Sequence, residues 1–409
     1  MITPREIAIQ HEQHLIRHLE TREQAYMEML RKLVDVNSGI DNPDGRLQCL
    51  TMLENAYKRL GFQCERVEKA GGMVHLVARR PALGKNAHNA PKVLILGHFD
   101  TVYDANTTFL SFTREGQYLH GPGVGDMKGG LVVALAALEA INSIQQLGDF
   151  DWLCVHNADE EVQSPTSRQL IEDLAKDRDF CLDFEIGRKT GAVVRSRAGV
   201  GRFFITVHGK AAHAGMDHAA GVNAIVGMAK IVEQLGNLAH PGKGTTLNVG
   251  TIHGGTKRNI VPDVCKIEVD VRVMTLDEAV RIEDQVAKIC SEPPIPRSRV
   301  EVMGGIGRPP WQRGPQHEAL IFHFQHIARA FGVTLGAEDT GGGSDANFTA
   351  AMGIPTIDGL GPVGESPHTF DERILAHSLI ERAKLVALAV LTWTRPTLLG
   401  ETTQDLVVN

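Results

Sequence analysis

The sequence predicts an α/β domain that is interrupted by a smaller α+β domain, and three observations carry this prediction. Apolar strand-like runs alternate with helical patterns in the first half of the chain, which is typical of an α/β sheet. Near Gly199 the pattern changes to strands with one polar face, and after Gly304 the α/β pattern resumes. We therefore expect a discontinuous larger domain of residues 1–197 and 304–409 and an inserted domain of residues 198–303.

Bulk composition favours a two-domain globular protein. The chain has 409 residues, of which 43% are hydrophobic and 22% charged. Its net charge is −7, from 42 basic and 49 acidic residues, and no dense Lys/Arg stripe is present, so nucleic acid is not an expected partner. The six cysteines are scattered without a CxxC pair, which argues against a zinc knuckle or a redox motif.

No segment of the sequence predicts membrane insertion or secretion. The first residues lack the apolar core of a signal peptide. The longest apolar stretch, Leu131–Leu138, is too short to span a bilayer. A cytoplasmic protein without a membrane partner is therefore expected.

The first elements alternate between helix and strand. Apolar residues at helical spacing predict one or two helices over Pro4–Lys32 and another over Leu47–Leu60, which Gly61 would end. Val74–Ala78 has strand character. Lys92–Gly97 is a continuous apolar run, typical of a central strand that is covered on both faces.

A glycine-rich turn then introduces the next helix. Gly121–Asp126 forms the turn, and a helix is expected over Met127–Ile144 with Asp126 close to its N-cap. Asp151–His156 reads as another buried strand. The elements expected after it are a helix over Ser167–Lys176 and a short strand over Cys181–Ile186. This order argues for a sheet with parallel portions.

The inserted domain and the last third of the chain have different patterns. Gly201–His208 alternates like a strand with one solvated face. The other elements expected in the inserted domain are helices over Val222–Gly236 and Leu276–Cys290 and strands over Thr246–Ile252, Cys265–Val273 and Val300–Met303. The elements expected after Gly304 are helices over Glu318–Phe331, from Gly341–Asp345 to Met352, and over Ile374–Trp393, with a short strand within Ile354–Leu360.

Acidic and histidine residues follow the buried strands. Taken singly, each has an ordinary explanation: a lone histidine is most often structural, Asp126 could be an N-cap, and adjacent glutamates such as Glu160 and Glu161 are usually a solvated face. Together with His98 and His368, however, they supply the imidazole and carboxylate ligands that Zn²⁺ and similar ions take. Open α/β sheets place their sites at the ends of strands. The sequence therefore predicts a metal-dependent hydrolase.

Competing motifs are not supported. The segment Gly121–Gly130 has neither the GxGxxG nor the GxxxxGK[ST] spacing of nucleotide-binding loops, and no GxSxG nucleophile elbow occurs. Gly341–Ser344 is either a plain loop or an anion-binding nest before a helix.

An ordered set of motifs resembles the M20 metallopeptidases, which include glutamate carboxypeptidases, acetylornithine deacetylases, succinyl-diaminopimelate desuccinylases and aminoacylases. The matching segments are Gly97–Val102, Gly121–Gly130, Asp159–Glu161, Gly209–Gly215, Asn259–Pro262, Asp270–Arg272, Gly341–Asp345 and His368. They occur in the family's order over nearly the whole chain. The Gly209–Gly215 and Gly341–Asp345 segments look most like the glutamate carboxypeptidase branch.

This resemblance implies a zinc-peptidase-like catalytic domain with a mixed sheet flanked by helices. The inserted domain would be a ferredoxin-like dimerisation or lid domain, and the protein would be a homodimer. Two Zn²⁺ ions per subunit are implied, with Co²⁺ or Mn²⁺ as possible substitutes.

The resemblance also assigns metal ligands. Asp126 would bridge the two ions. His98 and Glu185 would complete the ligands of one ion, and Glu161 and His368 those of the other. The peptide bond that follows the bridging aspartate would be cis.

Further roles follow from the same resemblance. Glu160 would be the general base, and Asp100 would orient His98. His213 would stabilise the oxyanion from the dimer partner. The implied substrate-binding residues are Arg272, Asn259 and Gly343.

The expected function is hydrolysis of a small N-acyl amino acid or dipeptide-like substrate with a free carboxylate, as in the glutamate carboxypeptidases. An N-acyl or N-carbamoyl amino acid amidohydrolase on the same scaffold is the alternative. A third possibility is a non-catalytic protein that binds metal or amino acids. Glu160 argues against that third reading, because a binding protein needs no general base.

Overall fold

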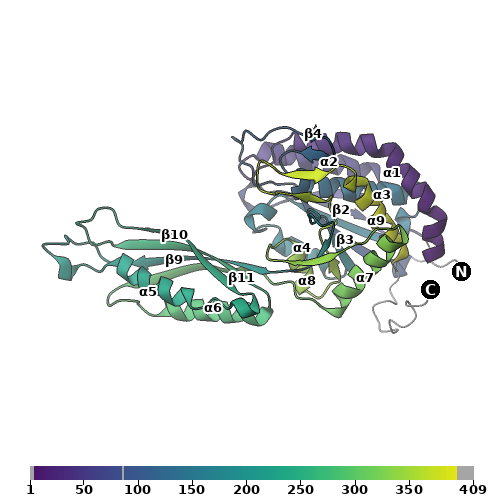
Figure 1. Ribbon diagram of the computed structural model, residues 1–409. Coiled ribbons are helices and arrows are strands. Elements are labelled where there is room, and N and C mark those ends of the chain that lie inside the picture. The colour runs from purple at the N-terminus through teal and green to yellow at the C-terminus, as the bar shows by residue number, and fades with distance from the viewer. Residues whose placement is uncertain (1–3, 85–86, 394–409) are drawn as a thin grey trace. The chain divides into compact units, whose positions relative to one another are not determined.

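The computed structural model describes residues 4–84 and 87–393, and these divide into two compact units (Figure 1). The larger unit consists of the described residues of Met1–Arg195, Arg313–Asp339 and Ser344–Asn409. The smaller unit consists of Ser196–Gln312 and Thr340–Gly343.

A six-stranded mixed sheet forms the centre of the larger unit. Its strands, in spatial order, are β1 (Gln63–Glu68), β2 (Val74–Arg80), β6 (Asp151–Asn157), β3 (Lys92–His98), β7 (Phe180–Asp183) and β14 (Thr356–Ile357). Strand β3 pairs in parallel with both β6 and β7, whereas β2 is antiparallel to β1 and β6. The predicted fold class, an α/β domain with a mixed sheet flanked by helices, is confirmed.

Helices cover both faces of this sheet, as the continuous apolar run of β3 predicts. The helices of the unit are α1 (Pro4–Val34), α2 (Pro43–Arg59), α3 (Gly129–Ser143), α4 (Arg168–Ala175), α7 (Pro315–Ala330), α8 (Ala346–Ala351) and α9 (Ser378–Thr392). Successive residues of a strand point to opposite faces. Val93 and Ile95 of β3 accordingly join the core cluster of α1, α3 and α9, whereas Leu94 and Leu96 join a second cluster with residues of α4 and α8.

Short strands complete the larger unit. β15 (Gly364–Glu365), β16 (Arg373–Leu375), β5 (Tyr118–His120) and β4 (Thr113–Glu115) form an antiparallel sheet in that order, and β8 (Val193–Arg197) pairs with β13 (Ala337–Thr340). The long helix expected over Ile374–Trp393 therefore begins later than predicted, because Ile374 pairs with Leu119 in this small sheet.

α2 and α3 also begin at residues that differ from the expectation. α2 begins at Pro43, four residues before Leu47, because the Asn42 side chain caps it by accepting a hydrogen bond from the Gly45 backbone N–H at 3.1 Å. α3 begins at Gly129 instead of Met127, since residues 124–128 form a separate wide turn.

That wide turn places Asp126 differently from the sequence prediction. Asp126 and Met127 have non-helical backbone angles, so Asp126 does not cap α3. The peptide bond between Asp126 and Met127 is cis, as the resemblance implies.

The smaller unit is a four-stranded antiparallel sheet covered by two helices. Its elements are β9 (Gly199–His208), α5 (Ala224–Gly236), β10 (Thr246–Gly254), β11 (Val264–Val273), α6 (Leu276–Ser291) and β12 (Arg299–Arg308). The spatial strand order is β10-β11-β9-β12. This βαββαβ arrangement is ferredoxin-like. Within the unit, α5 and α6 lie along the sheet in Figure 1, and their apolar residues share its core.

All six cysteines are free thiols, and five of them are buried. Among the helices of residues 4–84 and 87–393, none has the combined length and apolar character that crossing a membrane requires.

Candidate metal centre

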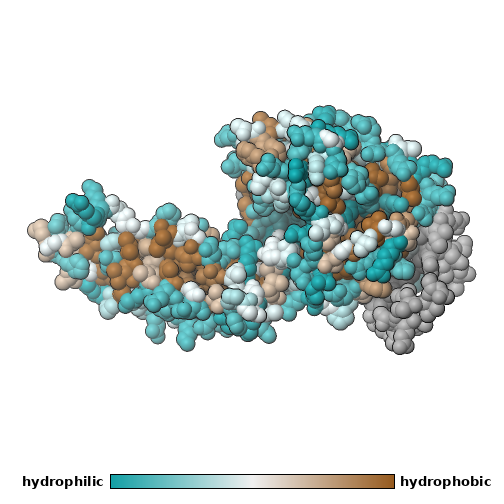
Figure 2. Space-filling view, in the orientation of Figure 1, coloured by the Kyte–Doolittle hydropathy of each residue, from teal (hydrophilic) through white to brown (hydrophobic). Residues whose placement is uncertain are grey.

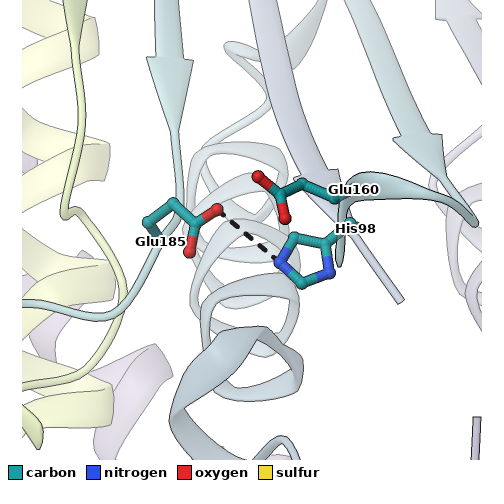
Figure 3. A group of neighbouring side chains, drawn as sticks. All are labelled: His98, Glu160 and Glu185. Carbon is teal, nitrogen blue, oxygen red and sulfur yellow. Dashed lines mark ion pairs between the residues drawn. The ribbon is translucent and has the colours of Figure 1, made fainter. Parts of the chain in front are cut away.

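Four of the predicted site residues come from the ends of three neighbouring parallel strands. His98 is the last residue of β3, Glu160 and Glu161 follow β6, and Glu185 lies two residues beyond the end of β7. Because parallel strands end at the same edge of a sheet, these side chains meet there. Figure 3 shows the carboxylates of Glu160 and Glu185 facing the ring of His98.

The His98 ring is buried and held from both of its nitrogen atoms. Nδ1 lies 3.0 Å from the backbone oxygen of Asp100, to which it donates, and 3.4 Å from the Asp100 carboxylate. Nε2 lies 3.1 Å from Oδ1 of Asp126 and 3.6 Å from Oε1 of Glu185. Since Nδ1 carries the donated proton, the Nε2 lone pair is available to a cation.

The Asp100 carboxylate has a second contact that the sequence did not predict. It accepts hydrogen bonds from the backbone N–H groups of Glu160 at 3.3 Å and Glu161 at 3.0 Å. Asp100 therefore fixes both the His98 ring and the turn that carries the two glutamates.

Asp126 lies between two histidines. Its Oδ1 faces Nε2 of His98 and its Oδ2 faces Nε2 of His368, each at 3.1 Å. Each histidine also has its own glutamate: Glu185 is 3.6 Å from His98, and Glu161 is 3.3 Å from His368. The arrangement has one carboxylate in the middle and one histidine–glutamate pair on each side.

Two groups of side chains in the described part of the chain have ligand atoms within 4.8 Å of one another. One group is His98, Glu160 and Glu185, and the other is His98, Asp126 and Glu161. The first contains the expected base, Glu160, and the second combines residues expected on different ions. His368 is in neither group. The described part of the chain therefore contains a set of donors that could hold a metal ion.

The electrostatics of the cluster favour bound positive charge. Burial, with repulsion from Asp126, raises the pKa of Glu161 and of Glu185 to about 8. Hydrogen bonds to Asp126 and Glu161 raise the pKa of His368 to about 11. Without a cation, the cluster therefore holds protons at neutral pH, and metal ions would displace them. Imidazole nitrogens and carboxylate oxygens fit Zn²⁺ and related ions.

Glu372 is a site residue that the sequence reasoning missed. It is fully buried, and its carboxylate accepts the backbone N–H groups of Gly123 at 3.0 Å, Gly125 at 2.8 Å and Asp126 at 3.0 Å. It also accepts the Tyr103 hydroxyl at 2.7 Å. The only sequence signal is an acid four residues after His368, in a charged run that reads as a solvated surface.

Tyr103 connects Glu372 to the segment that carries His368. Its hydroxyl lies 2.7 Å from the backbone oxygen of Thr369, the residue after His368. The loop that carries Asp126 is thereby tied to the segment that carries His368. Burial, with repulsion from Asp126, raises the pKa of Glu372 to about 7.

The glycine-rich segment before α8 supports the turn that carries Glu160. The carboxylate of Asp345 accepts a hydrogen bond from Asn157 Nδ2 at 2.7 Å and another from Ser164 Oγ at 2.5 Å. Asn157 and Ser164 flank the turn on either side. The end of the Gly341–Asp345 segment is therefore a buried anchor for that turn.

In the smaller unit, His213 and Asn259 lie on adjacent segments. The backbone N–H of Ala214 donates to the backbone oxygen of Asn259 at 3.0 Å. The His213 Nδ1 accepts the backbone N–H groups of Gly215 at 3.2 Å and Met216 at 3.1 Å. With Nδ1 an acceptor, Nε2 carries the proton and is a hydrogen-bond donor.

Arg272 lies at the opposite end of β11 from His213 and Asn259. Its Nε and Nη2 form a bidentate pair with Asp270 at 2.9 and 3.0 Å, and its Nη1 lies 3.4 Å from the backbone oxygen of Gly341. The structure thus brings Arg272 close to the segment that contains Gly343, but not to His213. The eight residue steps from Val264 to Arg272 span about 27 Å of extended strand.

Comparisons with known proteins agree with this architecture. Residues 195–297 match the peptidase dimerisation domain family of M20 enzymes. The chain is 30% identical over 368 residues to carboxypeptidase G2 of a Pseudomonas species, covering 89% of this chain and 88% of that protein. It is 26% identical over 351 residues to a succinyl-diaminopimelate desuccinylase of Delftia acidovorans, covering 80% of this chain and 88% of the relative.

Solved structures share the fold. An M20 family metallo-carboxypeptidase from Sulfolobus solfataricus superposes with a TM-score of 0.74 at 15% identity, covering 90% of this chain and 98% of the other. A tripeptidase from Staphylococcus aureus superposes with a TM-score of 0.72 at 26% identity, with the same coverage. With a relative at 30% identity over most of both chains, this chain belongs to the M20 family of metallopeptidases and is a metal-dependent hydrolase.

Proposed function

We propose that the protein is a di-zinc amide hydrolase in which Asp126 would be a ligand shared by the two ions. One ion would be held by His98 and Glu185, and the other by His368 and Glu161. The observation that carries this proposal is the position of Asp126, which presents one oxygen to each histidine at 3.1 Å. Co²⁺ or Mn²⁺ would suit the same donors.

Glu160 is the proposed general base. When bound, the two cations would lower the pKa of a water molecule and polarise the scissile carbonyl. Glu160 takes the proton of the attacking water and passes it to the leaving amine. Asp100 holds both the turn that carries Glu160 and the ring of His98, so it is a positioning residue.

The proposed substrate is a small N-acyl amino acid or dipeptide-like amide with a free carboxylate, as for glutamate carboxypeptidases. The relationship to carboxypeptidase G2 supports this class. Arg272 would bind the carboxylate, with Asn259 and the backbone near Gly343 as further contacts. The bidentate edge of Arg272 faces Asp270, so a substrate carboxylate would have to share or replace that pair.

We further propose a homodimer, with the larger unit as catalytic domain and the smaller as dimerisation and lid domain. The match to a peptidase dimerisation domain supports it. In addition, β10 is an edge strand with Ile252 more than half exposed, and hydrophobic residues gather on the smaller unit in Figure 2. Since His213 and Arg272 lie at opposite ends of β11, a small substrate could contact both only if the two residues came from different subunits.

An N-acyl or N-carbamoyl amino acid amidohydrolase is the second candidate. The desuccinylase relatives, at 25–26% identity, favour it. The proposed metal ligands serve either reaction, so only the substrate separates the two candidates. A binding protein without activity is disfavoured by the family membership and by Glu160.

A hydrolysis screen tests the proposal. The protein would be loaded with zinc, or treated with a chelator, and assayed on N-acyl amino acids, N-carbamoyl amino acids and dipeptides, and on the esters and neutral amides of the same compounds, which lack the free carboxylate. Turnover that needs zinc and a free carboxylate is the expected result. Turnover of esters or neutral amides alone would reject the proposed substrate class, and binding of a single zinc ion per subunit would reject the two-ion centre.

Subunit complementation tests the shared site. His213→Ala and Glu160→Gln proteins should each be inactive. Mixing equal amounts after reversible dissociation should restore about a quarter of the wild-type activity, because about half of the dimers would be hybrids and one of the two sites in each hybrid is intact. No recovery from mixed subunits that form hybrid dimers would place His213 in its own subunit's site, or outside any site.

A further inference from the structure

Three histidines lie on one face of α1. His11, His14 and His18 are separated by three and four residues. Since each residue turns a helix by about 100°, the three fall within an arc of about 60° of its circumference. His14 is exposed, whereas His11 and His18 are half-buried, and the neighbouring Leu15 and Leu19 are fully buried. The histidines therefore line the edge of the buried face of α1, and none of them is a residue of the metal centre.

His14 and His18 are the pair best placed to hold one ion. Residues four apart differ by about 40° around a helix and lie one above the other, whereas the step from His11 to His14 turns by about 60°. Two histidines at the four-residue spacing on one helix face are a known ligand pair for zinc. Imidazole also suits Cu²⁺ and Ni²⁺.

The His18 ring is available to a metal ion. Its Nε2 is buried and has no hydrogen-bond partner in the described part of the chain. Turning the ring outward toward His14 therefore breaks no hydrogen bond at this nitrogen and ends the cost of leaving it buried and unsatisfied. Burial, with repulsion from Arg22, lowers the pKa of His18, so the imidazole is neutral and able to ligate at neutral pH.

The charges beside the pair do not exclude a cation. Arg22 lies one turn after His18 on α1, and its Nε donates to Oε2 of Glu139 at 3.0 Å. The same oxygen accepts the Tyr26 hydroxyl at 3.0 Å. The Glu139 carboxylate also raises the pKa of His18, against the effect of Arg22. Because Arg22 is neutralised by Glu139, it repels an ion at His18 less than an unpaired arginine would.

This position is separate from the metal centre. α1 packs against α3, and Glu139 lies ten residues after Gly129, the first residue of α3. Ten residues correspond to about 15 Å along a helix. Asp126 precedes α3, at the other end from Glu139. An ion at His14 and His18 would therefore share no ligand with the metal centre.

We propose that His14 and His18 form a separate metal site, which binds one divalent transition-metal ion through two imidazole nitrogens and completes its coordination with water. The ion joins two successive turns of α1 and stabilises the folded protein, because the unfolded chain does not hold the two imidazoles together. Cu²⁺ should bind more tightly than Ni²⁺ or Zn²⁺. The inference does not depend on the proposed hydrolase activity.

The test adds Cu²⁺, up to one equivalent per subunit, to the zinc-loaded, full-length protein. Elemental analysis after dialysis should show copper in addition to the zinc of the metal centre, and electron paramagnetic resonance should show nitrogen coupling from two imidazoles. His14→Ala and His18→Ala should each lose this copper. Alanine is the best helix former, so both variants keep α1. The matched control is His11→Ala, from the same helix face, which should retain the copper.

The thermal stability of the same proteins provides a second measurement. Cu²⁺ should raise the Tm of the zinc-loaded wild-type protein but not that of His18→Ala. Equal shifts in the two proteins would overturn the inference, because the ion would then bind elsewhere. Copper that only replaces zinc, or copper that either His14→Ala or His18→Ala retains, would also overturn it. Loss of the copper in His11→Ala would overturn the assignment of the pair.

Discussion

Replacing Glu372 with glutamine should weaken metal binding although Glu372 is not a proposed ligand. Its Oε1 accepts the N–H groups of Gly125 and Asp126, and its Oε2 accepts the Gly123 N–H and the Tyr103 hydroxyl. The amide oxygen of glutamine can serve the first pair, but its NH₂ group then faces the second. The tyrosine hydroxyl can turn to accept from that NH₂ and donate its single proton to the backbone oxygen of Thr369, 2.7 Å away.

The Gly123 N–H can only donate and faces the NH₂ group, so the substitution leaves this buried donor unsatisfied. An unsatisfied buried donor costs about 1–3 kcal/mol, and the bonds that remain lose their charge assistance, at about 1 kcal/mol in total. We therefore expect the free energy of unfolding to fall by about 2–4 kcal/mol. Because Asp126 shares the displaced loop, zinc affinity should fall about 10- to 100-fold, as is usual for residues that orient a ligand.

Zinc affinity would be measured by competition with a chromophoric chelator, and stability by urea unfolding of the metal-free protein. Glu381→Gln is the matched control, because Glu381 is an exposed glutamate on α9 whose replacement should change neither quantity. Wild-type zinc affinity in folded Glu372→Gln would refute the reasoning. A loss of stability without a loss of affinity would show that the loop geometry does not limit metal binding.

Three further predictions follow from the structure. Glu160→Gln should keep its zinc, measured by elemental analysis, but its kcat should fall about 10²- to 10⁴-fold. A variant that keeps both its zinc and the wild-type kcat would exclude Glu160 as the general base. Burial lowers the pKa of His317 from 6.5 to about 4. As the pH falls, this histidine therefore binds a proton in the unfolded state before it does so in the folded state, and the free energy of unfolding should decrease by about 2 kcal/mol from pH 7 to pH 5. In the wild-type protein, His317 Nδ1 accepts the Thr356 backbone N–H at 3.1 Å. His317→Asn keeps an acceptor for this N–H but does not titrate, so urea titrations of the variant should lack that pH dependence. Chelation should lower the Tm, and zinc should restore it in proportion to the logarithm of its concentration; an unchanged Tm would mean that no metal is bound tightly.

The sequence predicted best what depends on local patterns. The run from Lys92 to Gly97 identified a central strand, and the strand end then placed His98 at the edge of the sheet. The start of α3 was predicted two residues early, because nothing local distinguishes the wide turn before Gly129 from a helix start. Glu372 was not predicted because its partner Asp126 lies 246 residues away, and a charged run gives no sign of burial.

Two further carboxylates hold the turns that carry the proposed ligands, and their negative charge is relevant to the number of metal ions. Asp100 accepts the N–H groups of Glu160 and Glu161, and Glu372 accepts that of Asp126. Holding the turns in this way adds negative charge around a cluster that is already acidic. The carboxyl groups gathered here are those of Asp100, Asp126, Glu160, Glu161, Glu185 and Glu372, against the two imidazoles of His98 and His368. Burial makes an excess of negative charge costly, so this excess of acids supports the proposed pair of divalent cations over a single ion.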